Sequence, residues 1–282
     1  MKIQDTSNIE SLTINALVYG LSKVGKTRLI ASAEAPFILS VEDSMLSLAG
    51  AGIKYTSIKD MAGMQDAMDW LRLSSEARQY KTICLDSITE LGELLLAEYK
   101  EKYKDARLAY GDMADHIFKI IRDLRSLPFD IYVIAKAGKA QDITGATLFS
   151  ADLPGAKAAV KMPYLFDETF ALRNIMLDGQ KEPKTYLQCR ADSQWEAGDK
   201  SGKLEMWEEP NLKYLFDKIR SVNGKEKLEM RNYVKELRGK IKDGRIDKQQ
   251  AADELEFLKG KSVEMGVPLS SDVVEYINNL LK

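Results

Sequence analysis

Hydrophobic and polar positions along the first half of the chain alternate between two patterns. Short continuous apolar runs are typical of buried strands, and apolar residues three or four positions apart are typical of amphipathic helices. The predicted strands are residues 12–19, 36–41, 53–58, 82–85 and 130–135. The predicted helices between them are residues 28–33, 61–71, 91–99 and 113–124. Strands that alternate with helices predict an α/β fold, with helices flanking a mostly parallel sheet.

The pattern changes in the second half of the chain. Residues 138–154 are polar, contain glycine and lack periodicity, so we expect a long loop there that is functional or mobile. Further apolar runs predict an antiparallel hairpin at one edge of the sheet, with turns at Asp178-Gly179 and Glu182-Pro183. These runs are residues 166–172, 174–177 and 185–190.

The last 60 residues or so differ in composition from the rest. A helix at 211–222 closes the sheet-containing part, and the chain then becomes rich in Lys and Glu. Helical patterns follow at residues 226–242, 247–261 and 271–281. The sequence therefore predicts a large α/β domain over residues 1–222 and a small helical appendage over residues 223–282.

Composition narrows the class of protein. Of the 282 residues, 45% are hydrophobic and 30% are charged, which is ordinary for a globular protein. The net charge of −2 means that any contact with nucleic acid must come from a local basic patch. Cys84 and Cys189 lie in apolar runs and predict reduced, buried thiols, while the lone His116 gives histidine catalysis or zinc binding little support. No signal peptide or membrane span is evident, so we expect a cytoplasmic protein with no membrane contact.

A glycine-rich loop follows the first predicted strand. It reads G-x-x-x-x-G-K-T, and the order strand, loop, helix is the context of a phosphate-binding P-loop. Backbone N–H groups of such a loop surround phosphates at a helix N-terminus. We expect Lys26 to reach the β- and γ-phosphates and the Thr27 hydroxyl to ligate Mg²⁺. The predicted nucleotide-binding residues are Gly20, Leu21, Ser22, Lys23, Val24, Gly25, Lys26, Thr27 and Arg28.

Charged residues end three of the predicted strands. Asp86 is placed like a Walker B aspartate that orients Mg²⁺, although an aspartate there can also cap the next helix. Glu42 is placed to polarise the water that attacks the γ-phosphate, with the adjacent Asp43 as the alternative. Lys136 is a candidate sensor of the γ-phosphate, or simply a surface lysine.

These residues carry a family resemblance. Residues 85–91 resemble the Walker B segment of RecA-type recombinases, and a glutamate in the position of Glu42 is common in that class. Residues 10–222 resemble small phage-encoded ATP-binding proteins, including the RecA-like single-strand annealing proteins of the fourth Sak type. The later segments that carry this resemblance are residues 154–157, 166–172, 195–204 and 209–212.

The resemblance implies a RecA-like core that binds ATP with Mg²⁺ and hydrolyses it slowly. It also implies single-stranded DNA binding in phage recombination, beside a single-strand-binding protein in the cytoplasm of a bacterial host. RecA-type sites lie between subunits of a ring or filament, which implies a homo-oligomer. Lys136 replaces the usual glutamine of this family, and Lys200 is the candidate for a cation that reaches a neighbouring subunit's phosphate, with Arg190 as a second candidate.

DNA-contacting segments of RecA-type proteins follow the third and fourth core strands. Here they are residues 100–112 and 137–161, where basic and aromatic residues can bind phosphates and bases. Acidic neighbours Glu101, Asp105 and Asp112 dilute the first of these segments. The candidate DNA-binding residues are Lys102, Tyr103, Lys104, Arg107, Tyr110, Lys139, Lys157 and Lys161.

Other functions compatible with a P-loop remain open. A P-loop kinase of a small substrate is one, although the arginines expected of its helical lid are represented only by the isolated Arg173 and Arg190. A nucleotide-dependent switch or loader that acts on a partner protein through the helical appendage is another. DNA-stimulated ATP hydrolysis would distinguish the recombination function from both.

Overall fold

The computed structural model describes residues 13–141, 147–177, 179–220, 233–237, 239–245 and 247–264. Contacts divide the chain into two units, Met1–Ile219 and Arg220–Lys282. The domain boundary predicted after residue 222 lies outside the described residues and stays a prediction. Within the described residues, no helix has the length and apolar character needed to cross a membrane.

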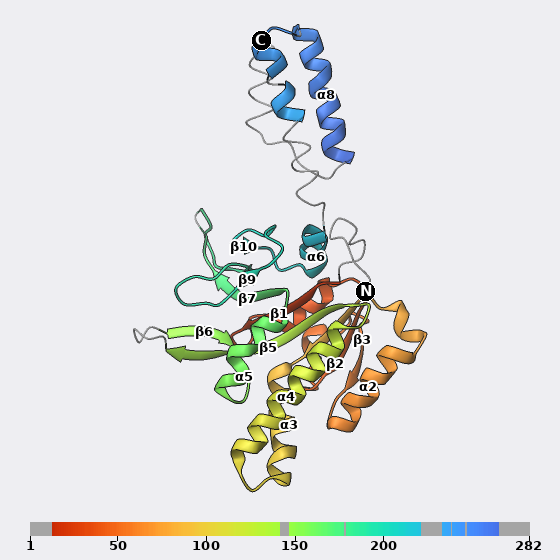
Figure 1. Cartoon of the computed structure of the whole chain (residues 1–282), viewed down its shortest axis with the longest axis vertical. Helices are drawn as coiled ribbons and strands as arrows, with labels where there is room; N and C mark the ends of the chain where they lie inside the picture. The colour runs from red at the N-terminus through yellow and green to blue at the C-terminus, as the bar shows by residue number, and fades with distance from the viewer. Residues whose placement is uncertain are drawn as a thin grey trace, which may run out of the picture. The chain divides into compact units, whose positions relative to one another are not determined.

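The described part of the first unit contains a mostly parallel sheet (Figure 1). Its parallel strands stand in the order β7-β1-β5-β4-β2-β3, so β1, which leads into the glycine-rich loop, lies inside the sheet between β7 and β5. These strands are β1 (Asn15–Gly20), β2 (Pro36–Ser40), β3 (Lys54–Ser57), β4 (Thr82–Asp86), β5 (Asp130–Gln141) and β7 (Glu168–Ile175). The predicted α/β fold class is confirmed.

Antiparallel strands extend this sheet. At one edge β8 pairs with β7 and β10 pairs with β8, while β9 pairs with the start of β7. The strand β6 pairs with the distal part of β5 as a hairpin that extends beyond the parallel strands (Figure 1). These strands are β6 (Thr147–Ala151), β8 (Lys184–Gln188), β9 (Gly198–Asp199) and β10 (Trp207–Glu208).

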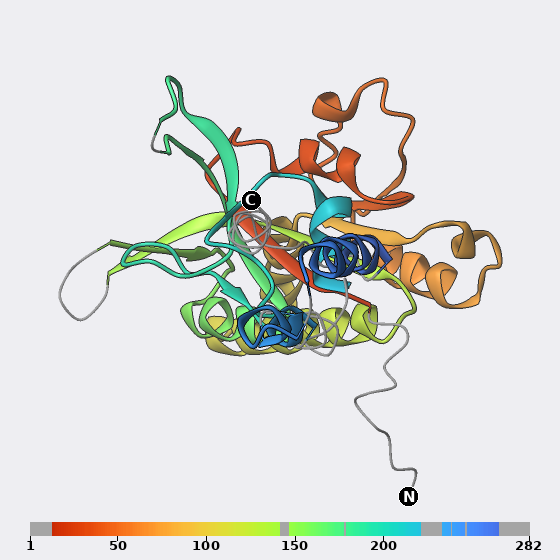
Figure 2. The ribbon, with the colours of Figure 1, turned by 90° about the horizontal axis from the view of Figure 1, so that it is seen from above.

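Helices cover both faces of the sheet (Figure 2). The alternation of side chains along β1 shows the two layers, because Leu17 and Tyr19 pack under one group of helices and Ala16 and Val18 under the other. The first face carries α2 (Met61–Leu73), η4 (Glu76–Gln79), α3 (Ile88–Lys102), α4 (Ala106–Arg125), α5 (Ala156–Lys161) and η5 (Met162–Leu165). The second carries α1 (Lys26–Leu29), η2 (Ile30–Ser32), η3 (Leu46–Leu48) and α6 (Leu212–Arg220).

Three predicted segments differ from the structure. The long loop expected at 138–154 was wrong, because β5 continues to Gln141 and pairs with β6; the hairpin lies outside the sandwiched part of the sheet and can therefore be polar. The helix expected from residue 113 begins at Ala106, where Asp105 accepts a hydrogen bond from the Arg107 amide. The runs at 166–172 and 174–177 form a single strand, β7. The turn at Asp178 involves a residue outside the described ones.

The second unit is helical where the structure describes it. Residues 233–237 and 239–242 are helical, and α8 (Lys248–Glu264) follows them. Leu237, Leu255 and Leu258 are buried, and Lys240 forms an ion pair with Glu254 at 3.0 Å. The described residues of the predicted appendage are thus mostly helical, whereas the helix predicted at 271–281 lies outside them.

Candidate functional site

The glycine-rich loop lies between β1 and α1. Gly20 ends β1 so close to β7 that a Cβ at this position would come within 2.6 Å of the Leu172 carbonyl oxygen. Gly25 has a φ of 106° directly before Lys26 starts α1, a conformation that side chains rarely adopt. Both glycines are therefore required by the geometry that brings the loop back onto the helix N-terminus.

Lys26 lies inside this loop. Its Nζ donates hydrogen bonds to the carbonyl oxygens of Gly20 at 2.8 Å and Leu21 at 2.9 Å. From β5, the Tyr132 hydroxyl donates to the Lys26 carbonyl at 3.1 Å and ties α1 to the sheet. Burial lowers the pKa of Lys26, while the nearby carboxylates of Glu42 and Asp86 oppose this effect. The ammonium is thus held at the point where the loop would receive phosphates.

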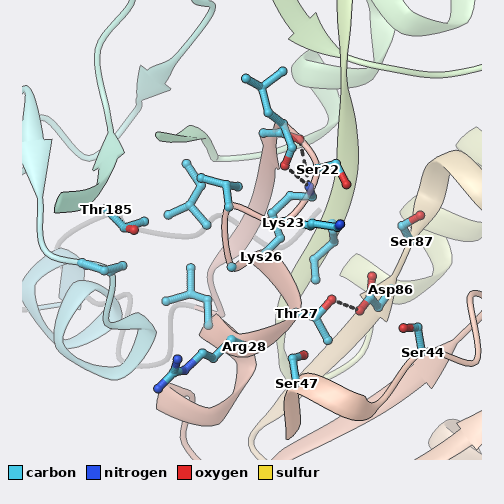
Figure 3. Close-up of a pocket in the computed structure, with 18 of the residues that line it drawn as sticks. Ser22, Lys23, Lys26, Thr27, Arg28, Ser44, Ser47, Asp86, Ser87 and Thr185 are labelled. Atoms are coloured by element: carbon cyan, nitrogen blue, oxygen red, sulfur yellow. Dashed lines mark hydrogen bonds between the residues drawn. The ribbon is translucent and has the colours of Figure 1, made fainter. Parts of the chain in front are cut away.

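Thr27 and Asp86 form a second part of the site. The Thr27 hydroxyl donates to Asp86 Oδ2 at 2.7 Å (Figure 3). Asp86 is 2% exposed, and its burial raises the pKa of the carboxyl to about 6, a shift that the bond from Thr27 opposes. A hydroxyl and a carboxylate oxygen are donors that suit Mg²⁺.

Thr27 and Asp86 would be the protein ligands of such a Mg²⁺ ion. Among the described residues, no group of three or more His, Cys, Asp or Glu side chains is placed to hold a metal. Mg²⁺ keeps several waters and shares substrate phosphates in nucleotide sites, so Thr27 and Asp86 are a sufficient protein contribution. The residues present therefore fit a nucleotide-bound Mg²⁺ rather than a metal centre of their own.

Glu42 lies beside this pair, because β2 and β4 are neighbours in the sheet. Its Oε1 accepts a hydrogen bond from the Ser87 hydroxyl at 2.7 Å, and its amide donates to the Asp86 carbonyl at 3.4 Å. Asp43, the alternative, points elsewhere: its carboxylate accepts a hydrogen bond from Ser57, and it does not line the cavity. Between the two acids, Glu42 is the one in the site.

Lys136 approaches the loop from β5, where it is the register partner of Gly20. Its ammonium pairs with Glu90 on α3, a hydrogen bond that raises the pKa of Lys136. The backbone amide of Lys136 donates a hydrogen bond to the hydroxyl oxygen of Thr89 at 3.0 Å. The lysine lines the same cavity as Lys26 and Asp86.

These residues surround one cavity of about 1220 Å³. Asp86, Ser87 and Thr27 lie on one side of it, and Thr185 and Arg28 lie on the other (Figure 3). Ser22, Lys23, Val24, Leu172 and Pro210 are among the other lining residues. The cavity is thus larger than the phosphate loop alone and continues toward the antiparallel edge of the sheet.

Sequence reasoning missed the residues that close this second side. Pro210 is held there because the Leu212 amide donates to the Ser32 side chain at 2.9 Å, across 180 residues of sequence. Thr185 is the second residue of β8, and its hydroxyl donates to Asn174 Oδ1 on β7 at 2.7 Å. Thr185 belongs to no motif, and the 209–212 segment that carries part of the family resemblance does not indicate that Pro210 lies beside the loop. The β7–β8 pairing and the contact with Ser32 bring the two residues there.

Lys200 and Arg190 do not line the described cavity. Lys200 lies beside the amino end of β7, where its Nζ donates to the Phe166 carbonyl at 2.6 Å and lies 3.6 Å from Asp167. Arg190 donates to the Leu204 carbonyl at 2.6 Å. Either could serve only a neighbouring subunit, and that role stays a prediction.

The candidate DNA-binding residues of 100–112 have intramolecular partners. The Tyr103 hydroxyl donates to Asp112, and Arg107 pairs with Asp105 at 2.9 Å. The Lys102 ammonium forms a cation–π contact with Tyr99, with Nζ 5.0 Å from the ring centroid. Lys104, Lys157 and Lys161 are exposed, and Lys139 lies 5.6 Å from the Phe149 ring centroid. Among the described residues, Lys104 and the two lysines of α5 are thus the least engaged of the set.

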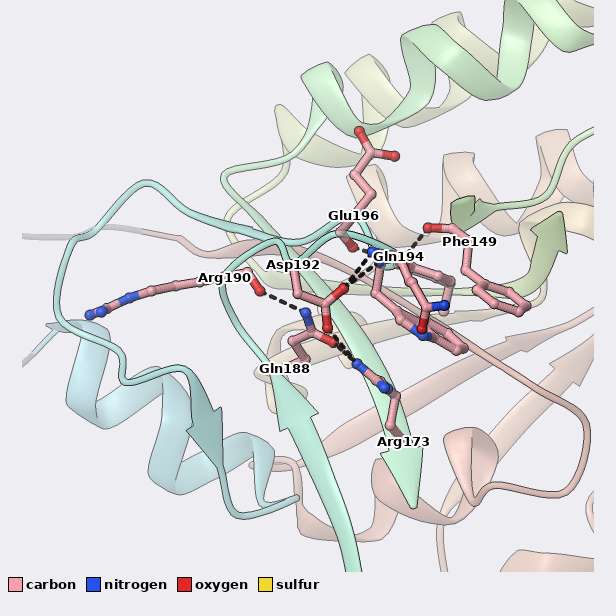
Figure 4. A network of polar contacts seen from close by, with 9 residues as sticks. Phe149, Arg173, Gln188, Arg190, Asp192, Gln194 and Glu196 are labelled. Atoms are coloured by element: carbon pink, nitrogen blue, oxygen red, sulfur yellow. Dashed lines mark hydrogen bonds and ion pairs between the residues drawn. The ribbon is translucent and has the colours of Figure 1, made fainter. Parts of the chain in front are cut away.

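Polar and aromatic contacts link the strand before the phosphate loop to the β5–β6 hairpin. Figure 4 shows the part of this network around Phe149, Arg173 and Asp192. The hydroxyl of Tyr19, the residue before Gly20, contacts the carbonyl oxygens of Phe149 at 2.9 Å and Glu196 at 2.6 Å. Trp195 stacks on Phe149 with ring centroids 4.2 Å apart, and Arg173 lies 4.7 Å from the Trp195 ring centroid. The strand that enters the loop and the hairpin are therefore packed as one unit.

Comparison with known proteins shows the family of this chain. Residues 13–201 match the family model described as an AAA domain, so the chain belongs to this family of P-loop proteins. Among solved structures, it is similar to a KaiC-like protein from the hyperthermophilic archaeon Pyrococcus horikoshii, with 12% sequence identity, 65% of this chain and 80% of that chain covered, and a TM-score of 0.40. No curated protein matches the chain.

Proposed function

We propose that this protein binds ATP with Mg²⁺, hydrolyses the ATP slowly and acts on single-stranded DNA. The observation that carries the ATPase part is one cavity that contains Lys26, the Thr27–Asp86 pair and Glu42. Phosphate binding, metal binding and activation of water are the three requirements of this reaction, and we assign each of them to its own side chain.

Each residue of this set has a distinct chemical task. Loop amides and Lys26 would bind the phosphates, and Thr27 and Asp86 would hold Mg²⁺, which when bound neutralises phosphate charge. Glu42, oriented by Ser87, would accept a proton from the attacking water. Lys136 lies beside the loop, where its ammonium can respond to the γ-phosphate by leaving Glu90.

The DNA part of the proposal rests on the resemblance of residues 10–222 to phage-encoded RecA-like annealing proteins. It includes a role in phage recombination inside a bacterial host, assembly into a ring or filament, and cooperation with a single-strand-binding protein. The β5–β6 hairpin supports it, because it carries Lys139 and packs against the strand that enters the phosphate loop.

ATP hydrolysis with and without single-stranded DNA, measured beside the particle size, tests this function. We expect slow hydrolysis that depends on Mg²⁺ and rises when the DNA is added. Hydrolysis that ignores DNA would favour a switch or loader of a partner protein, and phosphate transfer to a nucleoside would favour a kinase. Either result would contradict the proposal.

A further inference from the structure

A stripe of basic and aromatic side chains runs along the exposed face of α5 and η5. One face of this helical segment is core, with Ala158 and Met162 buried beneath it. The opposite face exposes Tyr164 by 80% and Val160 by 69%. We call this exposed set the α5 stripe; it consists of Lys157, Val160, Lys161 and Tyr164.

The charge of the α5 stripe has a single sign. Residues 153–166 contain two lysines and no Asp or Glu. Among the described residues, neither Lys157 nor Lys161 has a carboxylate within ion-pair distance. Because they are four residues apart, the two lysines lie about 6 Å apart along the helix axis and on the same side of it. The stripe therefore offers two uncompensated cations beside an exposed ring.

The alternative tyrosines are less available. Tyr103 stacks on Tyr99 with centroids 6.2 Å apart and donates its hydroxyl to Asp112. Tyr110 is 38% exposed, lies under the Lys100 ammonium and touches the Gly155 turn, where a Cβ would come within 3.2 Å of its ring. Binding a base at either ring would require breaking contacts that the fold already makes, whereas Tyr164 needs no rearrangement.

We propose that the α5 stripe binds single-stranded DNA, with the Tyr164 ring stacked on a base and Lys157 and Lys161 paired with flanking phosphates. This inference rests on the proposed function and assigns its DNA contact to one surface. A sequence-independent ring-plus-cation surface is how single strands are bound in general. A protein partner is less suited to it, because the cores of protein interfaces are depleted of lysine.

Fluorescence anisotropy with a labelled oligothymidylate, in ATP and Mg²⁺, tests this assignment. Tyr164→Ala should weaken binding by about fivefold to a hundredfold, while Tyr164→Phe, which keeps the ring, should bind as the wild type does. The double variant Lys157→Ala/Lys161→Ala should reduce the slope of log affinity against log salt by about 1.4. Tyr55→Ala is the matched control, since Tyr55 is 52% exposed on β3. ATP affinity should be unchanged in all of these variants.

Photo-crosslinking supplies an independent readout. A strand that contains iododeoxyuridine should crosslink to the tryptic peptide of residues 162–173, which holds Tyr164. Normal DNA binding by Tyr164→Ala, or a crosslink confined to residues 100–112, would overturn the assignment and leave the proposed function standing. Loss of self-association in Tyr164→Ala with unchanged DNA binding would show that a second copy covers the stripe. A wild-type protein that binds no single strand would instead defeat the proposed function itself.

Discussion

The hydroxyl of Ser87 donates a hydrogen bond to Oε1 of Glu42 at 2.7 Å and joins the ends of two neighbouring strands. Ser87 also caps α3, accepting a bond from the Glu90 amide at 3.4 Å. The carboxylate of Glu42 is therefore held by a residue whose own position is fixed by a helix N-terminus. This support matters for a general base, because the carboxylate must lie within hydrogen-bond distance of the water whose proton it accepts.

Replacement of Glu42 by glutamine should separate hydrolysis from binding. The amide keeps the size of the side chain and can still bond to Ser87, but it cannot take a proton. We expect the hydrolysis rate to fall by about 100-fold or more, while ATP affinity stays within about twofold of the wild type. Single-turnover hydrolysis and a titration with a fluorescent ATP analogue measure the two quantities.

Asp43→Asn is the matched control for this prediction. It removes the adjacent carboxylate, which bonds to Ser57 outside the cavity. Hydrolysis should be little changed in this variant. A normal rate in Glu42→Gln together with a large loss in Asp43→Asn would move the general base to Asp43.

Lys26→Ala should remove most of the affinity for ATP. The ammonium lies within the loop at 2.8 Å from the Gly20 carbonyl, where we expect it to bind the phosphates. Charged hydrogen bonds contribute about 1.5–3 kcal/mol each, so we expect ATP affinity to fall by about 10-fold to 100-fold. Calorimetry measures this affinity, and circular dichroism checks the fold. Unchanged ATP affinity in a folded variant would contradict the P-loop interpretation.

The parallel core and its loop could be predicted from sequence because their signals are local. An apolar run ending in Asp86 predicts a buried strand, and the carboxyl ends of parallel strands meet at one edge of the sheet. That rule places Asp86, Glu42 and Lys136 beside Lys26 before any coordinates are known. The structure puts all four around one cavity.

The remainder depends on contacts between distant segments. Pro210 reaches the cavity only because Leu212 bonds to Ser32, and no pattern near residue 210 encodes that contact. The β6 strand was missed since its half-exposed residues lack the apolar alternation of a core strand. The intramolecular partners of Tyr103 were missed because Asp112 was counted only as a charge that dilutes the basic segment.

Arg28→Ala should distinguish the two sides of the cavity. Arg28 is exposed on α1, and its side chain lies away from Asp86 and toward the side closed by Thr185 (Figure 3). A planar guanidinium there can stack on a nucleobase, which is worth about 0.5–2 kcal/mol. We expect ATP affinity to fall by about twofold to thirtyfold and tripolyphosphate affinity to stay unchanged. Lys26→Ala, the control, should weaken both ligands, and an equal loss in Arg28→Ala would assign Arg28 to the phosphates.

The pH dependence of stability should reveal Glu168. This residue begins β7 opposite Asp199 of β9 and is 2% exposed. Burial, followed by the charge of Asp199, raises the pKa of the Glu168 carboxyl to about 8. The Glu168 carboxyl therefore stays protonated at neutral pH in the folded protein, whereas in the unfolded chain it loses its proton at about pH 4.3. Since the folded state binds more protons in this interval, the free energy of unfolding contributed by Glu168 falls as the pH rises from about 4 to 8.

Glu168→Gln replaces the protonated acid by a neutral side chain of the same size that cannot ionise. Relative to the wild type, the variant should gain stability as the pH rises, with a Tm difference that grows between pH 5 and pH 8.5 by about 2–4 °C for each kcal/mol involved. Thermal unfolding followed by circular dichroism at several pH values measures this difference. Glu93→Gln, on the exposed surface of α3, is the matched control for loss of a glutamate. If the Tm difference for Glu168→Gln were the same at pH 5 and pH 8.5, the carboxyl would carry the same charge in the folded and unfolded chains, and burial would not control its protonation.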